Sequence, residues 1–130
     1  LETNVKENNS SVKPVMADAL EICETFADGE LDLIVSNPPY IKSADIETLQ
    51  KEVRLEPRLA LDGGEDGYDF YREIVSRWSR KLKKGGALAF ELGENQADAV
   101  KALMTDKGFS DFKISLDFGG VQRAIIGTLL

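Results

Sequence analysis

The sequence predicts an α/β protein whose largely parallel sheet ends in an antiparallel β-hairpin. Short apolar runs alternate with segments of helical periodicity, which is typical of a parallel sheet with helices on both faces. The longest amphipathic segment, 68–84, separates two such runs, 31–36 and 87–92. Two further strand-like runs flank Gly119-Gly120, a pair that suits a two-residue hairpin turn with positive φ.

The N-terminal residues predict a helix end, a strand and a second short helix. Residues 1–9 have the composition of a helix that fades into a polar stretch, and residues 12–17 are a short strand candidate. Asp18 closes that strand and can cap a short helix or turn over 18–26. This segment therefore contributes one strand to the predicted sheet.

The apolar run 31–36 (Leu-Asp-Leu-Ile-Val-Ser) follows a turn at 28–29 and is apolar enough to be a central strand. After it, Ser43 can cap a helix over about 44–52, and 53–62 predicts an irregular excursion. Long insertions after a strand are often functional.

The segment 68–84 is the clearest helix in the sequence, because large apolar residues recur in it every four positions. We expect Gly85-Gly86 to end this helix. Residues 87–92 then form a buried strand, and Asn95 caps a helix that ends near Gly108. The residues that define the apolar faces of these two helices are Phe70, Ile74, Trp78 and Leu82 in the first, and Ala97, Val100, Leu103 and Met104 in the second.

Composition limits the possible functions. The 130 residues suffice for one small domain, and a net charge of −7 disfavours nucleic acid unless the basic residues gather on one face. One basic cluster, between Arg77 and Lys84, is more often a solvated helix face than a phosphate site. Histidine is absent, which excludes Ser-His-Asp hydrolysis and most metal sites. A single cysteine, Cys23, fits a reducing cytoplasm, and no apolar run is long enough for a membrane span.

The candidate site is Asn37–Tyr40 (Asn-Pro-Pro-Tyr), directly after the strand at 31–36. A carboxamide nitrogen is a poor nucleophile because its lone pair is delocalised. To methylate it, an enzyme needs two hydrogen-bond acceptors that hold its two N–H groups and so localise and orient the lone pair. The Asn37 side-chain oxygen and the Pro38 carbonyl can serve as these acceptors. Pro38 and Pro39 make the corner rigid, and the ring of Tyr40 can stack on a flat substrate group. The alternative is an ordinary turn after a strand.

Asn37–Tyr40 also resembles the signature of class I methyltransferases that act on planar nitrogens. The segments around it narrow the resemblance to the HemK/PrmC family, which methylates the glutamine of the Gly-Gly-Gln motif in peptide chain release factors. The matching residues are Glu52-Val53-Arg54, Glu56-Pro57, Ala60-Leu61, Gly63-Gly64, Asp66-Gly67, Tyr71, Phe90-Glu91-Leu92-Gly93 and Gln96.

This resemblance implies a Rossmann-like methyltransferase sheet and S-adenosylmethionine as the methyl donor. Asn37, Pro38 and Tyr40 would then be catalytic, and Asn37 would contact both cofactor and substrate. Pro38, Pro39 and Tyr40 would shape the glutamine pocket. Asp18 and Ala19 would lie beside the adenine, although Ala19 stands where the family often has an aromatic residue.

The resemblance further implies that residues 1–130 are a truncated catalytic domain. The family's glycine-rich cofactor loop, its ribose-binding acid and its N-terminal helical domain would lie upstream of Leu1. We therefore expect these residues alone to bind S-adenosylmethionine weakly and to be inactive. We also expect self-association, because the missing strands would leave the edge of an apolar strand exposed.

Two other functions remain open at this point. A DNA adenine methyltransferase would use the same corner on a flipped base, but the acidic balance disfavours direct contact with nucleic acid. A non-catalytic protein-binding fragment is the second alternative. Glu56-Pro57 can orient a loop over the pocket or mark a turn, and Glu91 can bond within the site or face water.

Overall fold

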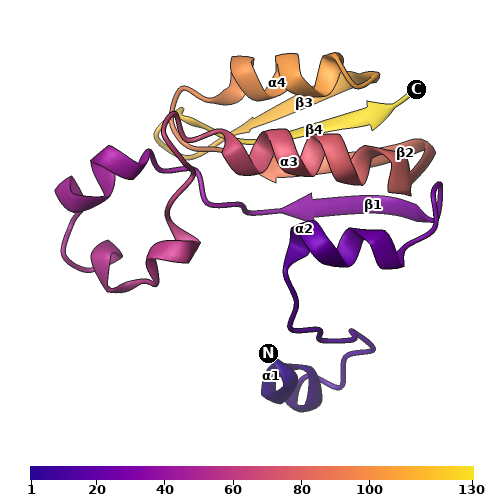
Figure 1. Cartoon of the computed structure of the whole chain (residues 1–130), viewed down its shortest axis with the longest axis horizontal. Coiled ribbons are helices and arrows are strands. Elements are labelled where there is room, and N and C mark those ends of the chain that lie inside the picture. Colours follow the sequence, from indigo (N-terminus) through magenta and orange to yellow (C-terminus); the bar gives the residue numbers. More distant parts are fainter.

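The structure, a computed structural model, describes all 130 residues and contains a four-stranded mixed sheet (Figure 1). Its strands are β1 (Leu31–Ser36), β2 (Leu82–Glu91), β3 (Phe109–Leu116) and β4 (Gln122–Leu129), in the spatial order β1-β2-β4-β3. β1 and β2 are parallel, whereas β4 is antiparallel to β2 and β3 on either side of it. The predicted α/β class with a C-terminal antiparallel hairpin is confirmed.

The helices are α1 (Glu2–Glu7), α2 (Ala19–Ile22), α3 (Asp69–Trp78) and α4 (Ala97–Thr105). None of them has the length and apolar character needed to cross a membrane. Short 3₁₀ turns complete the structure, at Cys23–Thr25, Ser43–Thr48, Val53–Leu55, Arg58–Ala60 and Ser79–Lys81.

The expectation that helices cover both faces of the sheet is wrong. α3 connects β1 to β2 and α4 connects β2 to β3, and both connections run in the same direction across the sheet. Because such crossovers are right-handed, both helices lie on one face, as Figure 1 shows. On the other face of β1, Leu33 and Val35 remain 53% and 70% exposed.

The core lies between α3, α4 and the sheet. Tyr71 of α3 packs edge-to-face on Phe90 of β2, with ring centroids 5.2 Å apart. Full burial of a large apolar side chain contributes roughly 1.5–3 kcal/mol, so this layer accounts for most of the hydrophobic stabilisation of the fold. The fully buried large side chains of the layer are Tyr71, Leu88, Phe90, Leu92, Val100, Met104 and Ile125.

The strand expected at 12–17 does not form. Val15 is exposed and Met16 is fully exposed, and the segment forms no β-ladder. A strand needs a neighbour to satisfy its N–H and C=O groups, and no strand of the described structure pairs with this one. The short helix after it is confirmed: Asp18 caps α2, and its carboxylate accepts a hydrogen bond from the Leu20 N–H at 2.7 Å.

β1 has the predicted bounds but lies at the edge of the sheet instead of its centre. Only β2 pairs with it, in a parallel register that aligns Ser36 with Phe90. The apolar composition of β1 suits a strand with two neighbours, so composition alone could not reveal that one side is unpaired.

The helix expected at 68–84 ends earlier, at Trp78. The chain then makes a 3₁₀ turn, and residues 82–86 belong to β2. The turn is fixed by the buried Lys81, whose ammonium donates to the Phe26 carbonyl at 2.7 Å and pairs with Asp28 at 2.9 Å. Leu82 matched the helical period, but it is buried as the first residue of a strand.

The basic cluster at the end of α3 is largely paired with carboxylates and, apart from the buried Lys81, lies on the charged surface as expected. Arg80 pairs with Glu24 at 2.5 Å, and Lys83 pairs with Asp32 at 2.6 Å. The cluster is not a helix face throughout, because Lys83 lies on β2.

Two local details of the C-terminal half also differ from expectation. Gln96, not Asn95, occupies the N-cap of α4, and it makes no side-chain cap bond. The hairpin loop is closed by the Asp117 N–H, which donates to the Val121 carbonyl at 2.8 Å and leaves three residues between them. Of the two glycines expected to have positive φ, only Gly120 does, at 81°.

Candidate active site

The corner Asn37–Tyr40 leaves the sheet at the carboxyl end of β1, where open α/β sheets bind ligands. Asn37 is exposed, Pro38 is buried, and Pro39 and Tyr40 are half-buried. The two prolines hold the backbone rigid, so that the exposed amide of Asn37 projects from a fixed base. An exposed polar group on a rigid support is the arrangement that substrate orientation requires.

The hydroxyl of Tyr40 donates a hydrogen bond to the Glu91 carboxylate at 3.2 Å, which links the corner to the end of β2. Burial raises the pKa of Tyr40, and the negative charge of Glu91 raises it further. The phenol therefore stays neutral and continues to donate near neutral pH. Glu91, for which the sequence left two possibilities open, is both exposed and bonded within the site.

A hollow of about 230 Å³ opens beside Asn37, Pro38 and Tyr40. Glu56 and Glu91 also line it, and no basic residue does. An acidic hollow of this kind favours a cationic ligand group, such as a sulfonium, and tolerates a neutral amide. The presence of Glu56 agrees with the expectation that its loop lies over the pocket.

A second hollow, of about 510 Å³, is also lined by Asn37, together with Pro39. Asp18 and Ala19, the residues predicted to contact the cofactor, line this hollow. The structure therefore brings them together with Asn37, although 18 and 37 are far apart in the sequence. Trp78 fixes their position, because its indole N–H donates to the Ala19 carbonyl at 2.9 Å.

A third hollow, of about 480 Å³, lies on the face of the sheet that no helix covers. Val35, Asn37 and Glu91 line it together with Arg123. Asn37 is thus the residue shared by all three hollows.

The segment 41–64 after the corner, called the excursion from here on, forms 3₁₀ turns, and the α-helix expected over 44–52 is absent. Ser43 does not cap a helix; its hydroxyl donates to the Asp62 carboxylate at 2.5 Å and ties the two ends of the excursion together. A parallel bridge between Ile41 and Asp62 reinforces this closure.

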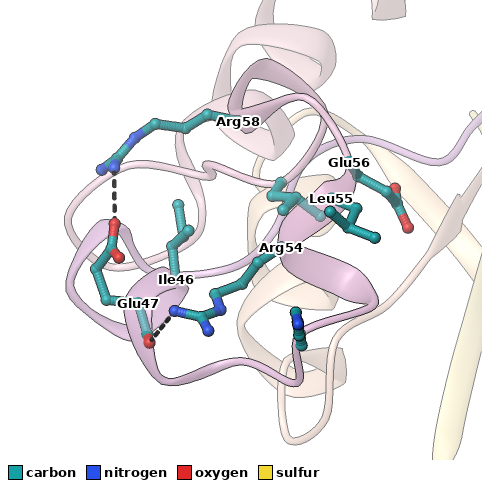
Figure 2. A pocket seen from close by; sticks show the side chains of 8 residues that line it. Ile46, Glu47, Arg54, Leu55, Glu56 and Arg58 are labelled. Carbon is teal, nitrogen blue, oxygen red and sulfur yellow. Dashed lines mark hydrogen bonds and ion pairs between the residues drawn. The ribbon is translucent and has the colours of Figure 1, made fainter.

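Figure 2 shows a further hollow, of about 360 Å³, within the excursion. Arg58 pairs with Glu47 across it at 3.6 Å, and the Arg54 guanidinium donates to the Glu47 carbonyl at 3.4 Å. Glu56 and Leu61 line both this hollow and the one beside Tyr40. The excursion therefore forms a wall of the candidate site.

One residue of the site was not recognised from the sequence. Gln96 matched the family pattern but was given no role, and the structure places its carboxamide nitrogen 3.0 Å from the Tyr40 carbonyl, to which it donates. Glutamine is usually exposed, so a glutamine that matches a family pattern shortly after a buried strand could have indicated a polar role in the interior.

The chain is similar in sequence to release factor glutamine methyltransferases. It is 50% identical to the one from Geobacter sulfurreducens over 107 residues, which are 82% of this chain and 38% of that protein. It is 38% identical to the one from Clostridium acetobutylicum over 127 residues, 97% of this chain and 42% of that protein. The chain thus spans about two fifths of the length of these curated relatives. No protein-family model matches it.

Solved structures show the same fold. A methyltransferase from Pyrococcus furiosus superimposes with a TM-score of 0.61 at 20% identity, over 98% of this chain and 54% of that one. The release factor-specific protein-(glutamine-N5) methyltransferase from Alicyclobacillus acidocaldarius superimposes with a TM-score of 0.51 at 28% identity, over 85% and 54%.

The mixed sheet with its single antiparallel strand is the fold of solved methyltransferases, and the Asn-Pro-Pro-Tyr corner lies at the end of β1 within it. Over the part of their length that it matches, the chain is homologous to the release factor glutamine methyltransferases, the HemK/PrmC family.

Proposed function

We propose that this chain forms part of the catalytic domain of an enzyme that methylates the glutamine side chain of the Gly-Gly-Gln motif in peptide chain release factors. The observation that carries this proposal is the position of Asn37, which is exposed between a hollow lined by Tyr40 and one lined by Asp18 and Ala19. The first hollow is the proposed glutamine pocket, and the second is the proposed cofactor side.

In this mechanism the corner holds the glutamine amide. The Asn37 side-chain oxygen and the Pro38 carbonyl accept hydrogen bonds from its two N–H groups, which fixes the orientation of the nitrogen and of its lone pair. The Tyr40 ring packs on the flat amide and limits its rotation. When bound, S-adenosylmethionine supplies an electrophilic methyl group on a positively charged sulfur.

The reaction forms one N–C bond and breaks one C–S bond, and the amide nitrogen releases one proton. Because that proton can leave after the new bond forms, the corner needs no general base. The residues of the chain therefore act by orientation, which requires reacting atoms about 3–3.5 Å apart. The carboxylates of Glu56 and Glu91, which line the glutamine hollow, favour the positive charge of the donor.

S-adenosylmethionine fits the second hollow only in part. Asp18 has one carboxylate oxygen engaged in capping α2, and Ala19 offers no aromatic ring for adenine. Among these 130 residues no glycine-rich turn joins a strand to a helix, which is the usual site for the rest of such a cofactor.

We therefore propose that these 130 residues alone bind S-adenosylmethionine weakly and transfer no methyl group. Isothermal titration calorimetry of the chain should show no binding at micromolar cofactor. Micromolar affinity would contradict this expectation and would mean that the described residues hold the cofactor unaided. The cytoplasm is the proposed location, where the buried, unpaired Cys23 stays reduced.

A chimera tests the proposed activity directly. Residues 1–130 would replace the matching segment of the Geobacter sulfurreducens relative, and release factor, cofactor and chimera would be incubated together. Mass spectrometry of the Gly-Gly-Gln peptide should show one added methyl group on the glutamine. A folded chimera that leaves the release factor unmodified would contradict the proposal.

The same assay distinguishes the two alternative functions. Methylation of adenine in an added oligonucleotide, with the release factor untouched, would identify a DNA adenine methyltransferase. Capture of release factor without any methylation would identify a non-catalytic binding fragment.

A further inference from the structure

Gln96 lies at the centre of a buried hydrogen-bond network behind the corner. It is only 8% exposed. Its amide nitrogen donates to the carbonyls of Tyr40 at 3.0 Å and Gly67 at 3.4 Å. Its side-chain oxygen accepts from the Gly93 N–H at 2.9 Å and from the Tyr71 hydroxyl at 3.1 Å. Both donor hydrogens of the carboxamide are therefore engaged, and its oxygen accepts one hydrogen bond from Gly93 and a second that Tyr71 shares with Glu91.

These four bonds join three segments that are distant in the sequence. Tyr40 ends the corner, Gly67 belongs to the loop before α3, and Gly93 follows β2. The Tyr71 hydroxyl has one hydrogen, which it shares between the Gln96 oxygen at 3.1 Å and the Glu91 carbonyl at 2.8 Å, and this ties the network to the end of β2. Unpaired buried polar groups are costly, so the network has one favourable arrangement.

Tyr40 is held at both ends by this surrounding structure. Gln96 holds its main-chain carbonyl, and Glu91 accepts from its hydroxyl at 3.2 Å. The backbone of the neighbouring loop also packs tightly against it: a Cβ atom on Gly67 would lie 2.6 Å from the Tyr40 carbonyl oxygen. The corner therefore cannot shift toward this loop without breaking the Gln96 bonds.

We infer that Gln96 is a positioning residue that fixes the Asn37–Tyr40 corner for methyl transfer. The inference deepens the proposed function of the corner and rests on it. Gln96 does not face any of the hollows at the corner; it acts through the Tyr40 carbonyl.

The substitution Gln96→Glu isolates this role, because it keeps the shape of the side chain. The carboxylate can still accept from Gly93 and Tyr71, but it cannot donate to Tyr40 or Gly67. Gln50→Glu is the matched control, since it makes the same charge change at an exposed glutamine. Thermal unfolding of each variant shows whether the fold is retained.

Fluorine NMR of the full chain labelled with fluorotyrosine reports the corner without any need for activity. The chain has three tyrosines, and Tyr40→Phe assigns the resonance of Tyr40. In Gln96→Glu the Tyr40 resonance should shift and broaden, whereas in Gln50→Glu it should stay in place. An unchanged Tyr40 resonance in the folded variant would overturn the inference.

A pH titration supplies the rescue. Burial raises the pKa of a carboxyl group, so the introduced acid should become protonated at mildly acidic pH. The protonated acid can again donate one hydrogen bond to the Tyr40 carbonyl, and the Tyr40 resonance should return toward its wild-type position. A purely structural role predicts no such return, and its absence would count against positioning.

Kinetics of the chimera complete the test. Gln96→Glu should lower kcat by roughly tenfold or more, because small displacements of reacting groups are costly, while KM for the cofactor changes by less than about twofold. Gln50→Glu should match wild type. A kcat equal to that of the control would overturn the inference. A wild-type chimera without activity would refute the proposed function instead, and the NMR result alone would then decide the position of the corner.

Discussion

Asn37 is the one exposed residue of a corner whose other members are partly or wholly buried. Exposure separates its chemical role from the stability of the fold, because an exposed side chain contributes little to packing. Pro38 and Tyr40 contribute both to the hollow and to the stability of the fold, because each lines the hollow and is also held by contacts with its surroundings. Asn37 is therefore the best position at which to test the proposed chemistry alone.

Asn37→Ala should strongly slow methyl transfer by the chimera with little effect on stability. The alanine removes one of the two acceptors for the substrate amide, which costs about 10²–10³-fold in kcat for a comparable preorganised group. The free energy of unfolding should change by no more than about 0.5 kcal/mol, as for other exposed sites. Steady-state kinetics and urea unfolding check both statements.

The control for this substitution is Asn8→Ala, which changes an exposed asparagine near the N-terminus. It should leave kcat unchanged. Full activity of Asn37→Ala would show that the amide is oriented by other groups and would remove the main support for the mechanism.

Local chemistry accounts for the residues that could be predicted from the sequence. The Asp18 cap depends on the two following residues, and Asn37–Tyr40 depends on a strand directly before it. The role of Gln96 could not be predicted in this way. It depends on the meeting of Tyr40 and Gly67 with the end of β2, and no local pattern encodes that contact.

At the scale of elements, one carboxylate collects three of the hydrogen bonds that close the excursion from Ile41 to Gly64, beside the backbone bonds that join its two ends. Asp62 accepts hydrogen bonds from the Ser43 hydroxyl at 2.5 Å, the Gly64 N–H at 3.1 Å and the Arg58 guanidinium at 3.2 Å. These bonds, that from Ser43 first, lower the pKa of Asp62 below its ordinary value of 3.8. The closure should therefore depend on pH.

Proton linkage gives the direction in which the stability of this closure changes with pH. A carboxyl group with a lowered pKa in the folded state contributes stability that is fully present above pH 3.8 and is lost as the pH falls through the folded value. We predict that the amides of Ile41 and Gly63, which bond within the excursion, lose protection in that acid range. Hydrogen exchange measured by NMR, corrected for intrinsic rates, tests this.

Asp62→Asn provides the comparison, because an amide does not titrate. In this variant the amides of Ile41 and Gly63 should already be less protected from exchange at neutral pH, and their protection should not fall further in the acid range. An identical acid step in both proteins would assign it to another group.

The hairpin between β3 and β4 offers a second prediction about an element. Gly120 has φ of 81°, a region that residues with a Cβ atom enter only with strain, whereas the φ of Gly119 is not in that region. Gly120→Ala should therefore lower the free energy of unfolding by about 1 kcal/mol.

Gly119→Ala is the matched variant in the same loop. A Cβ atom there would meet only the Asp117 side chain, at 3.2 Å, so its cost should be clearly smaller. Urea unfolding of both variants gives the difference, and equal losses would contradict the assigned turn geometry.

The errors in predicting elements have a common physical cause. Periodicity identified α3 but continued it to Leu82, because a buried strand residue can fall on the helical period. The apolar run 12–17 has strand composition, yet a strand forms only with a neighbour. Periodicity describes one segment at a time, whereas both outcomes depended on what lies beside it.

At the scale of the whole molecule, the sheet is open in two ways. No strand pairs with the outer edge of β1, and no helix covers the face that carries Leu33 and Val35. An unpaired, apolar strand edge is a template for pairing with another chain, because its N–H and C=O groups lack partners. Charged side chains are one of the usual protections of such an edge, and Asp32 is the only charged residue within β1.

We predict that the 130-residue chain self-associates through the edge of β1, as the sequence already indicated. Light scattering after gel filtration should give a mass of at least twice that of one chain, falling on dilution.

Val35→Lys should shift the equilibrium toward single chains, because a charge on the uncovered face opposes the packing of a second copy. Leu59→Lys is the control, since it places the same charge on another exposed apolar residue, in the turn Arg58–Ala60 and outside β1. It should leave the mass unchanged. A mass equal to one chain at all concentrations would refute association, and equal effects of the two lysines would place the contact elsewhere than β1.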